Sequence, residues 1–127
     1  MEAVAIMEDA WLRPLVEAFY ARVRADPLLE PVFATAVTDW ADHHRRLADF
    51  WSSVMLTTGR YKGNPVALHM RHAEAMTPER FDRWLALWRQ TSDEMLPPAA
   101  AAAVQAKAER IAESLALAIR YRRPAAA

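Results

Sequence analysis

The sequence predicts an all-α fold, and three observations support this prediction. Alanine, leucine, arginine and glutamate dominate the chain of 127 residues, and β-branched residues are sparse. Apolar residues recur at intervals of three and four rather than two, which is the period of an amphipathic helix. Prolines follow capping residues at several expected helix starts. We therefore expect one helical domain over residues 1–127, with loose ends at 1–13 and 121–127.

The first predicted helix is followed by a short, proline-rich segment. Pro14 suits a first helical turn, and the apolar stripe after it, at a spacing of four, ends near Asp26. Residues 28–33 are too short for a long helix, so we expect a turn or a single helical turn there. This segment should end in a buried Phe33 that closes against the core.

A long second helix should follow. Either Thr38 or Asp39 can cap its first turn, and Gly59 occupies a natural stop position. Two of the four histidines lie inside this helix. Residues 59–63 then have the basic and aromatic character of a surface loop.

The second half of the chain contains three further predicted helices. Asn64-Pro65 caps and starts a short helix that carries the other two histidines. Thr77-Pro78 repeats this signal and opens a longer helix, which Pro97-Pro98 stops. An alanine-rich helix over residues 98–120 completes the domain, and neither an internal repeat nor a linker is present.

Composition excludes several classes of function. Sixteen basic and sixteen acidic residues balance, so we expect neither nucleic-acid binding nor attraction to an anionic membrane surface. The absence of cysteine excludes disulfides, zinc–thiolate sites and cysteine nucleophiles. Two glycines are too few for glycine-rich phosphate loops. A basic leader and an apolar run of eighteen residues are also missing, so a cytoplasmic protein without a membrane span is expected.

The most informative feature is the position of the large aromatic and imidazole side chains. They fall on five successive predicted segments and can line one cavity. A flat apolar macrocycle of haem size needs apolar walls, one strong nitrogen ligand to iron, and a few polar groups on the opposite side. The side chains that offer these parts are Tyr20, Phe33, His43, Phe50, Trp51, His69, Phe81 and Trp84.

At this point the sequence resembles a known family, the group III truncated haemoglobins of the globin superfamily. The resemblance covers roughly residues 18–115 and rests on the order and spacing of several short stretches. The double-glycine turns of the other truncated groups are missing, which fits group III. The matching stretches are Phe19-Tyr20-x-x-Val23-Arg24-x-Asp26-x-Leu28, Pro31-Val32-Phe33, Asp39-Trp40-x-x-His43, Asp49-Phe50-Trp51-Ser52-Ser53, Thr58-Gly59-Arg60-Tyr61-x-Gly63-Asn64-Pro65 with His69 four residues on, Phe81-x-Arg83-Trp84-Leu85 and Arg110-Ile111-Ala112.

The resemblance implies a truncated-globin fold, a helical sandwich around a haem pocket, with His69 as the proximal ligand to iron. A neutral imidazole can bind iron through one nitrogen while a second-shell acceptor orients its other N–H. His72 lies one turn further on and is rotated away, so both imidazoles cannot bind one iron from the same side. The alternative for His69 is an ordinary half-buried helix residue. In this family a Leu-Pro-type stretch often follows the proximal position. In this chain residues 70–74 read Met-Arg-His-Ala-Glu instead.

On the opposite side of the haem, the resemblance places Tyr20 and Trp84. Their O–H and N–H groups can donate hydrogen bonds to bound dioxygen, each contributing about 1–3 kcal/mol when the acceptor is charged and desolvated. The resemblance also places His43 there, as a donor or as a gate. Periodicity alone does not separate His43 from His44, which is expected on a solvated face. For any of these side chains, plain core packing is the alternative.

The remaining expected contacts of the haem are apolar walls and a basic rim. Arg46, one turn from His43, and the loop residues Arg60, Tyr61 and Lys62 are candidates to bind the two haem carboxylates. The expected wall residues are Phe19, Phe33, Leu47, Phe50, Trp51 and Phe81.

Three classes of function follow. The first is a haem b protein that binds or transports dioxygen or another diatomic gas. The second is a haem enzyme of the peroxidase or nitric oxide dioxygenase type; without a flavin or nicotinamide motif, its electrons must come from a separate reductase or a small molecule. The third is a non-haem helical protein, either an interaction module or a metal bundle using His43, His69, His72 and Glu74. The bundle is disfavoured because the chain contains no Glu-x-x-His motif.

Overall fold

The computed structural model describes residues 7–63, 75 and 77–122, and within them the regular elements are all helical. This confirms the all-α prediction. The short helix predicted after Asn64-Pro65 lies outside the described residues. The described elements are η1 (Asp9–Trp11), α1 (Leu12–Ala25), α2 (Glu30–Ala36), α3 (Trp40–Leu56), α5 (Pro78–Met95) and α6 (Pro98–Arg122).

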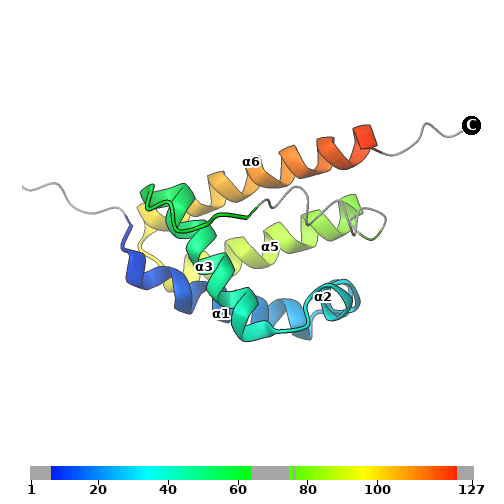
Figure 1. Cartoon of the computed structure of the whole chain (residues 1–127), viewed down its shortest axis with the longest axis horizontal. Helices are drawn as coiled ribbons and strands as arrows, with labels where there is room; N and C mark the ends of the chain where they lie inside the picture. Colours follow the sequence, from blue (N-terminus) through cyan, green and yellow to red (C-terminus); the bar gives the residue numbers. More distant parts are fainter. Residues whose placement is uncertain (1–6, 64–74, 76, 123–127) are drawn as a thin grey trace, which may run out of the picture.

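The four long helices pack as two pairs, α1 with α3 and α5 with α6 (Figure 1). Helix α1 contacts α3 and α5, and α5 lies against α6 after the tight turn between them. The main core fills the space between these four helices. Its largest fully buried side chains are Trp51, Trp88, Phe19, Leu12, Leu15 and Leu29. A second cluster, around Phe81 of α5 and Leu115 and Ile119 of α6, lies further along α6.

The beginning of the described chain belongs to the folded domain, in contrast to the loose end expected over residues 1–13. Residues 9–11 form a 3₁₀ helix, and α1 begins at Leu12, before Pro14. Met7 and Leu12 are both buried in the main core. Their apolar contacts hold this segment, and sequence periodicity missed it because one turn is too short to show a stripe.

The proline-rich segment after α1 forms a longer helix than predicted. Helix α2 has seven residues, Glu30–Ala36, instead of a turn or one helical turn. Pro31 lies in its first turn, where its missing N–H leaves no hydrogen bond unmade. Asp26 supports the turn before it, because its carboxylate accepts hydrogen bonds from the N–H groups of Leu28 (2.9 Å) and Leu29 (3.2 Å). Phe33 is half-buried rather than buried.

Asp26 should make a pH-dependent contribution to stability. Burial raises its pKa, but the Arg83 guanidinium 2.5 Å away and the two backbone N–H groups outweigh burial and hold the pKa below its ordinary value. The contribution of this carboxylate to the free energy of unfolding is therefore fully present above the unfolded pKa of about 3.9. It is lost as the pH falls through the lower folded pKa. We expect Asp26→Asn to reduce the free energy of unfolding at pH 7 by about 1–3 kcal/mol.

Denaturant unfolding at pH 7 and at pH 3 checks this prediction. The difference between the parent and Asp26→Asn should shrink at the lower pH, because pH 3 lies below the unfolded pKa and the carboxyl of the unfolded parent chain is then largely protonated. Asp82→Asn, at an exposed carboxyl on α5, is the matched control and should have little effect at either pH. An equal loss of stability at both pH values for Asp26→Asn would contradict the assigned role.

Helix α3 begins as predicted but ends earlier. Asp39, rather than Thr38, is the cap: its carboxylate accepts a hydrogen bond from the N–H of Asp42 at 3.1 Å. The helix ends at Leu56 because Thr57 adopts the left-handed conformation, with φ of 57°. Gly59 also has positive φ, at 71°, but it lies in the following loop and is not the stop residue.

The last two helices match the prediction closely. Thr77 caps α5 by accepting a hydrogen bond from the N–H of Arg80 at 3.2 Å. Helix α6 continues to Arg122, slightly beyond the predicted end at residue 120. Among the described helices, none is both long and apolar enough to cross a membrane.

Candidate functional site

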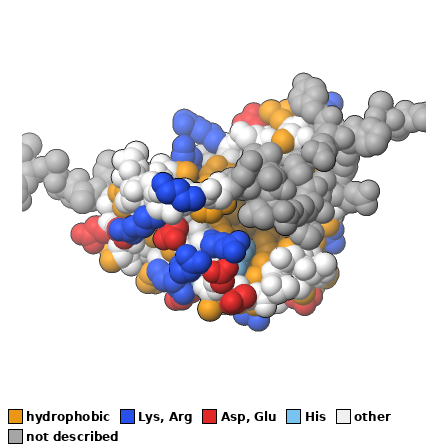
Figure 2. All heavy atoms as spheres, viewed as in Figure 1, with side chains coloured by type: hydrophobic (Ala, Val, Ile, Leu, Met, Phe, Trp, Pro, Cys, Tyr) orange, Lys and Arg blue, Asp and Glu red, His pale blue; other side chains and the backbone are white. Residues whose placement is uncertain are grey.

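A pocket of about 310 Å³ opens between the helices, within the size range of small-molecule sites. Figure 2 shows this hollow, with apolar atoms and a histidine ring at its base and charged side chains beside it. All five described α-helices and the loop after α3 contribute residues. Its lining consists of Tyr20, Val32, Phe33, Ala36, Val37, Thr38, Asp39, Asp42, His43, Arg46, Leu47, Phe50, Trp51, Tyr61, Phe81, Trp84, Ile111, Ala112 and Leu115.

The predicted apolar walls come together around this pocket. Phe33 from α2, Phe81 from α5 and three residues of α3, Leu47, Phe50 and Trp51, all line it. Phe19 is the exception: it is fully buried and lies behind the pocket wall. Its ring contacts Trp84 and Trp88 edge to face, with ring centroids 5.4 Å and 5.0 Å apart. It is therefore a core residue.

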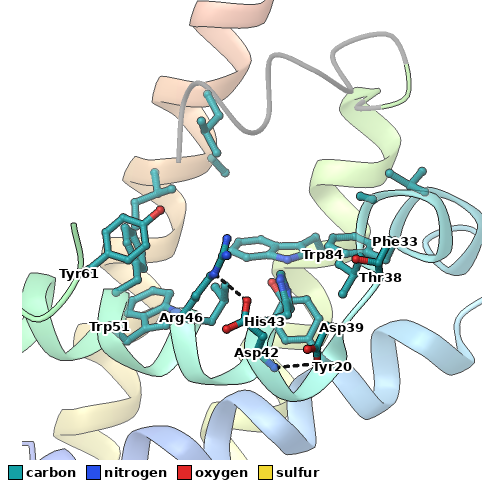
Figure 3. Close-up of a pocket in the computed structure, with 18 of the residues that line it drawn as sticks. Tyr20, Phe33, Thr38, Asp39, Asp42, His43, Arg46, Trp51, Tyr61 and Trp84 are labelled. Carbon is teal, nitrogen blue, oxygen red and sulfur yellow. Dashed lines mark hydrogen bonds and ion pairs between the residues drawn. The ribbon is translucent and has the colours of Figure 1, made fainter. Parts of the chain in front are cut away.

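Tyr20 and Trp84 both line the pocket, beside His43 (Figure 3). Tyr20 is only 4% exposed, and this burial raises the pKa of its phenol above the ordinary value, while a side-chain hydrogen bond with Trp84 acts in the opposite direction. Because an indole N–H can only donate, the phenol oxygen is the acceptor in this bond. The phenol stays protonated at neutral pH, so its O–H is available as a donor.

The structure distinguishes between the two histidines of α3. His43 lines the pocket and contacts the ring of Tyr20, with centroids 4.8 Å apart. His44 does not line the pocket, but it is half-buried against Tyr20 and Trp40 rather than on a solvated face. Burial, together with the positive charges of Arg13 and Arg24, lowers the pKa of His44 despite the opposing effect of Glu17. His44 therefore favours the neutral form.

Arg46 lies at the edge of the pocket as predicted. Its Nε atom is 2.8 Å from a carboxylate oxygen of Asp42 (Figure 3), and its side chain is 56% exposed. Asp42 also pairs with Arg45 at 2.5 Å. Because two arginines share this carboxylate, Asp42 keeps a partner if Arg46 turns toward another anion.

The loop after α3 places only one of its three candidates in the pocket. Tyr61 lines it, and the backbone N–H of Tyr61 donates to Ser53 Oγ at 2.8 Å. Arg60 instead pairs with Asp9 at 2.7 Å and is not among the lining residues. The sequence could not show this because Asp9 is 51 residues away. Lys62 is exposed and does not line the pocket either.

Comparison with known proteins now identifies the family. Residues 5–120 match the family described as bacterial-like globin. The chain belongs to this globin family. A crystal structure of the group III truncated hemoglobin from Campylobacter jejuni has the same fold, with a TM-score of 0.80 and 25% sequence identity over 94% of this globin and 95% of that chain. The predicted resemblance to group III and the predicted truncated-globin fold are both confirmed.

Two curated relatives are also truncated hemoglobins, one of group 3 and one of group 2. The globin is 32% identical over 81 residues to the group 3 truncated hemoglobin ctb of Campylobacter jejuni, a stretch covering 61% of this chain and 63% of the relative. It is 34% identical over 84 residues to the group 2 truncated hemoglobin YjbI of Bacillus subtilis, covering 65% and 62%. The matches thus span less than two thirds of either relative.

Several lining residues of this globin were not among the predicted site residues. Ile111 and Leu115 of α6 are two of them, and the sequence does not show which part of a helix faces a cavity. The sequence could have predicted Asp42 as the partner of Arg46, because it lies four residues before Arg46 on one helix. His69 lies outside the described residues, as do His72 and Glu74. The residues that the structure describes contain no group of three metal-ligand side chains.

Proposed function

We propose that this globin binds haem b through His69 and holds dioxygen or another diatomic ligand beside Tyr20 and Trp84. The observation that supports it best is the buried Tyr20 phenol in a pocket whose walls are largely aromatic and aliphatic. A buried O–H that has no hydrogen-bond acceptor is costly. A small polar ligand in this pocket would supply that acceptor. The globin family and the group III relatives support the same proposal.

The lining residues fit a haem. Aromatic and aliphatic side chains on α2, α3, α5 and α6 suit the apolar faces of a macrocycle, and Arg46 at the edge suits a propionate. When bound, the haem supplies an iron centre that takes a diatomic ligand and exchanges electrons with it. His69 is the residue that we assign to the iron, by its position after Asn64-Pro65.

The protein contributes hydrogen bonds and exclusion of water. Trp84 and Tyr20 form a short chain of donors, in which the indole N–H donates to the phenol oxygen and the phenol O–H remains for the ligand. Accepting a hydrogen bond makes the phenol a stronger donor. Packing of Tyr20 against Phe33 (5.7 Å between centroids) and Trp40 (5.9 Å) fixes its ring before a ligand arrives.

An absorption spectrum tests this function directly. The purified protein, supplied with haem, should show the intense haem band, and reduction followed by carbon monoxide should shift it. A protein that binds no haem under these conditions would contradict the proposal and would favour a non-haem helical module.

Arg46 is expected to retain the haem by pairing with a propionate. Because the side chain is more than half exposed, the pair should contribute only about 0.2–1 kcal/mol, so Arg46→Gln should accelerate haem loss by roughly 1.5- to 5-fold. Transfer of haem to an excess of an acceptor apoprotein measures this rate. Arg45→Gln is the matched control, since Arg45 shares Asp42 but does not line the pocket. Equal acceleration in both variants would point to Asp42, rather than the haem, as the relevant partner.

His43 is expected to act as a gate or weak contact, because the Tyr20 O–H, backed by the hydrogen bond from Trp84, already supplies a donor to the ligand. His43→Leu should change the association rate or the ferric coordination more than the dissociation of dioxygen. Flash photolysis measures association, and displacement by carbon monoxide measures dissociation. His44→Leu, outside the pocket lining, is the control. A tenfold rise in dissociation, about 1.4 kcal/mol, with unchanged association would show that His43 is the principal donor.

A further inference from the structure

Four polar side chains form a cluster, the Asp9 cluster, that joins η1 to the loop after α3. One carboxylate oxygen of Asp9 accepts a hydrogen bond from Ser52 Oγ at 2.7 Å, and the other accepts one from Arg60 Nη1, also at 2.7 Å. Thr58 Oγ1 lies 2.8 Å from Ser52 Oγ. Because the one proton of the Ser52 hydroxyl goes to Asp9, Thr58 is the donor in this contact. None of the four residues lines the pocket.

The Asp9 carboxylate is charged at neutral pH and is the acceptor on which the cluster depends. Hydrogen bonds from Arg60 and Ser52 hold the pKa of Asp9 below its ordinary value, although desolvation acts in the opposite direction. Ser52 is 1% exposed, so its hydroxyl needs an acceptor inside the protein. Removal of the Asp9 carboxylate would take away this acceptor and release Arg60 at the same time.

The cluster holds a loop that has no regular structure of its own. Residues 58–62 form neither helix nor strand, so no ladder of backbone hydrogen bonds fixes them. Two of them, Thr58 and Arg60, are held by the Asp9 cluster. One residue further on, the N–H of Tyr61 donates to Ser53 Oγ at 2.8 Å. The position of Tyr61 therefore depends on side chains that bind the loop on both sides of Gly59.

Tyr61 and Arg46 interact at the edge of the pocket. Both line it, and the ring of Tyr61 contacts Phe50 edge to face, with centroids 5.3 Å apart. Burial raises the pKa of the Tyr61 phenol, and the positive charge of Arg46 acts in the opposite direction. The phenol O–H and the guanidinium N–H groups are all donors, so together they suit one carboxylate.

We propose that Asp9 is a positioning residue for the haem site: it holds Arg60, and thereby keeps Tyr61 at the pocket edge as a donor to a haem carboxylate. This inference rests on the proposed haem site. Asp9 does not line the pocket, so it acts through the loop. Its removal should therefore weaken haem retention only as far as the Tyr61 hydroxyl contributes to it.

Fluorine NMR tests whether Asp9 sets the position of Tyr61. The chain contains three tyrosines, so labelling with 3-fluorotyrosine gives three resonances, and Tyr61→Phe identifies that of Tyr61. In the haem-loaded, ferrous carbon monoxide form, which is diamagnetic, Asp9→Ala should increase the difference in the Tyr61 shift between H₂O and D₂O. The Tyr20 resonance should stay unchanged. Glu8→Ala removes a neighbouring exposed carboxylate that makes no capping hydrogen bond, and it is the matched control.

The rate of haem loss separates positioning from a general loss of stability. Tyr61→Phe removes one hydrogen bond and should accelerate haem loss roughly 2- to 12-fold. Asp9→Ala should accelerate it by up to the same factor. The double variant should lose haem no faster than Tyr61→Phe alone, because both changes remove the same contact. A purely structural role of Asp9 would make the two effects multiply.

Arg60→Gln is the second variant, because it removes the other member of an exposed ion pair. It should reproduce the effects of Asp9→Ala and keeps the test open if Asp9→Ala does not fold. An unchanged Tyr61 resonance in either folded variant, or effects that multiply in the double variant, would overturn the proposal. The absorption spectrum of each sample shows whether haem is bound, so failure of the haem site is recognised separately.

Discussion

Replacing His69 with alanine should abolish stoichiometric haem binding. If residues 65–72 form the helix that the sequence predicts, His72 is rotated away from His69, so we do not expect it to replace the lost ligand. Haem titration followed by absorption spectroscopy measures both the stoichiometry and the coordination state.

His72→Ala is the matched control and should bind haem like the parent. The assignment would be wrong if His69→Ala kept an unchanged five-coordinate spectrum while His72→Ala lost the haem. Addition of imidazole to His69→Ala offers a further check, because a free ligand should restore part of the binding if the site is otherwise intact.

The second large effect concerns ligand dissociation. Removing a donor that contributes about 1–3 kcal/mol should raise the dissociation rate of dioxygen roughly 5- to 150-fold. Tyr20→Phe removes the O–H, and Trp84→Phe removes the N–H that donates to the same phenol. Since these side chains interact, the effect of the double variant should be less than the product of the single effects.

Stopped-flow displacement of dioxygen by carbon monoxide measures these rates. Tyr61→Phe removes a phenol at another part of the pocket and should leave dissociation close to that of the parent. Rates within twofold of the parent in both Tyr20→Phe and Trp84→Phe would reduce these residues to packing.

The structure shows which parts of the fold the sequence predicts well. The caps at Asp39 and Thr77 and the long helices after them are local features, so residue type and spacing define them. The 3₁₀ turn before Leu12 depends on contacts with distant helices, and periodicity missed it. The end of α3 at Leu56 depends on Thr57 adopting the left-handed conformation, which residues other than glycine rarely adopt.

The candidate site shows the same division. Tyr20, His43 and Trp84 meet in the pocket, but spacing alone left His43 and His44 equivalent, and the resemblance to the family made the choice. Arg60 pairs with Asp9 and does not line the pocket, and the sequence does not show this because Asp9 lies far away in the chain. The stacked rings of Trp51 on α3 and Trp88 on α5 depend on how these two helices meet, which a single sequence does not reveal.

A crystal structure of the haem-loaded protein, with iron located by its anomalous scattering, tests the central claim most directly. The account predicts haem between Leu47 and Phe81, with iron bound to His69 on one face and Tyr20 and Trp84 on the other. Iron bound to His72 or to His43 alone, or haem outside this pocket, would contradict it.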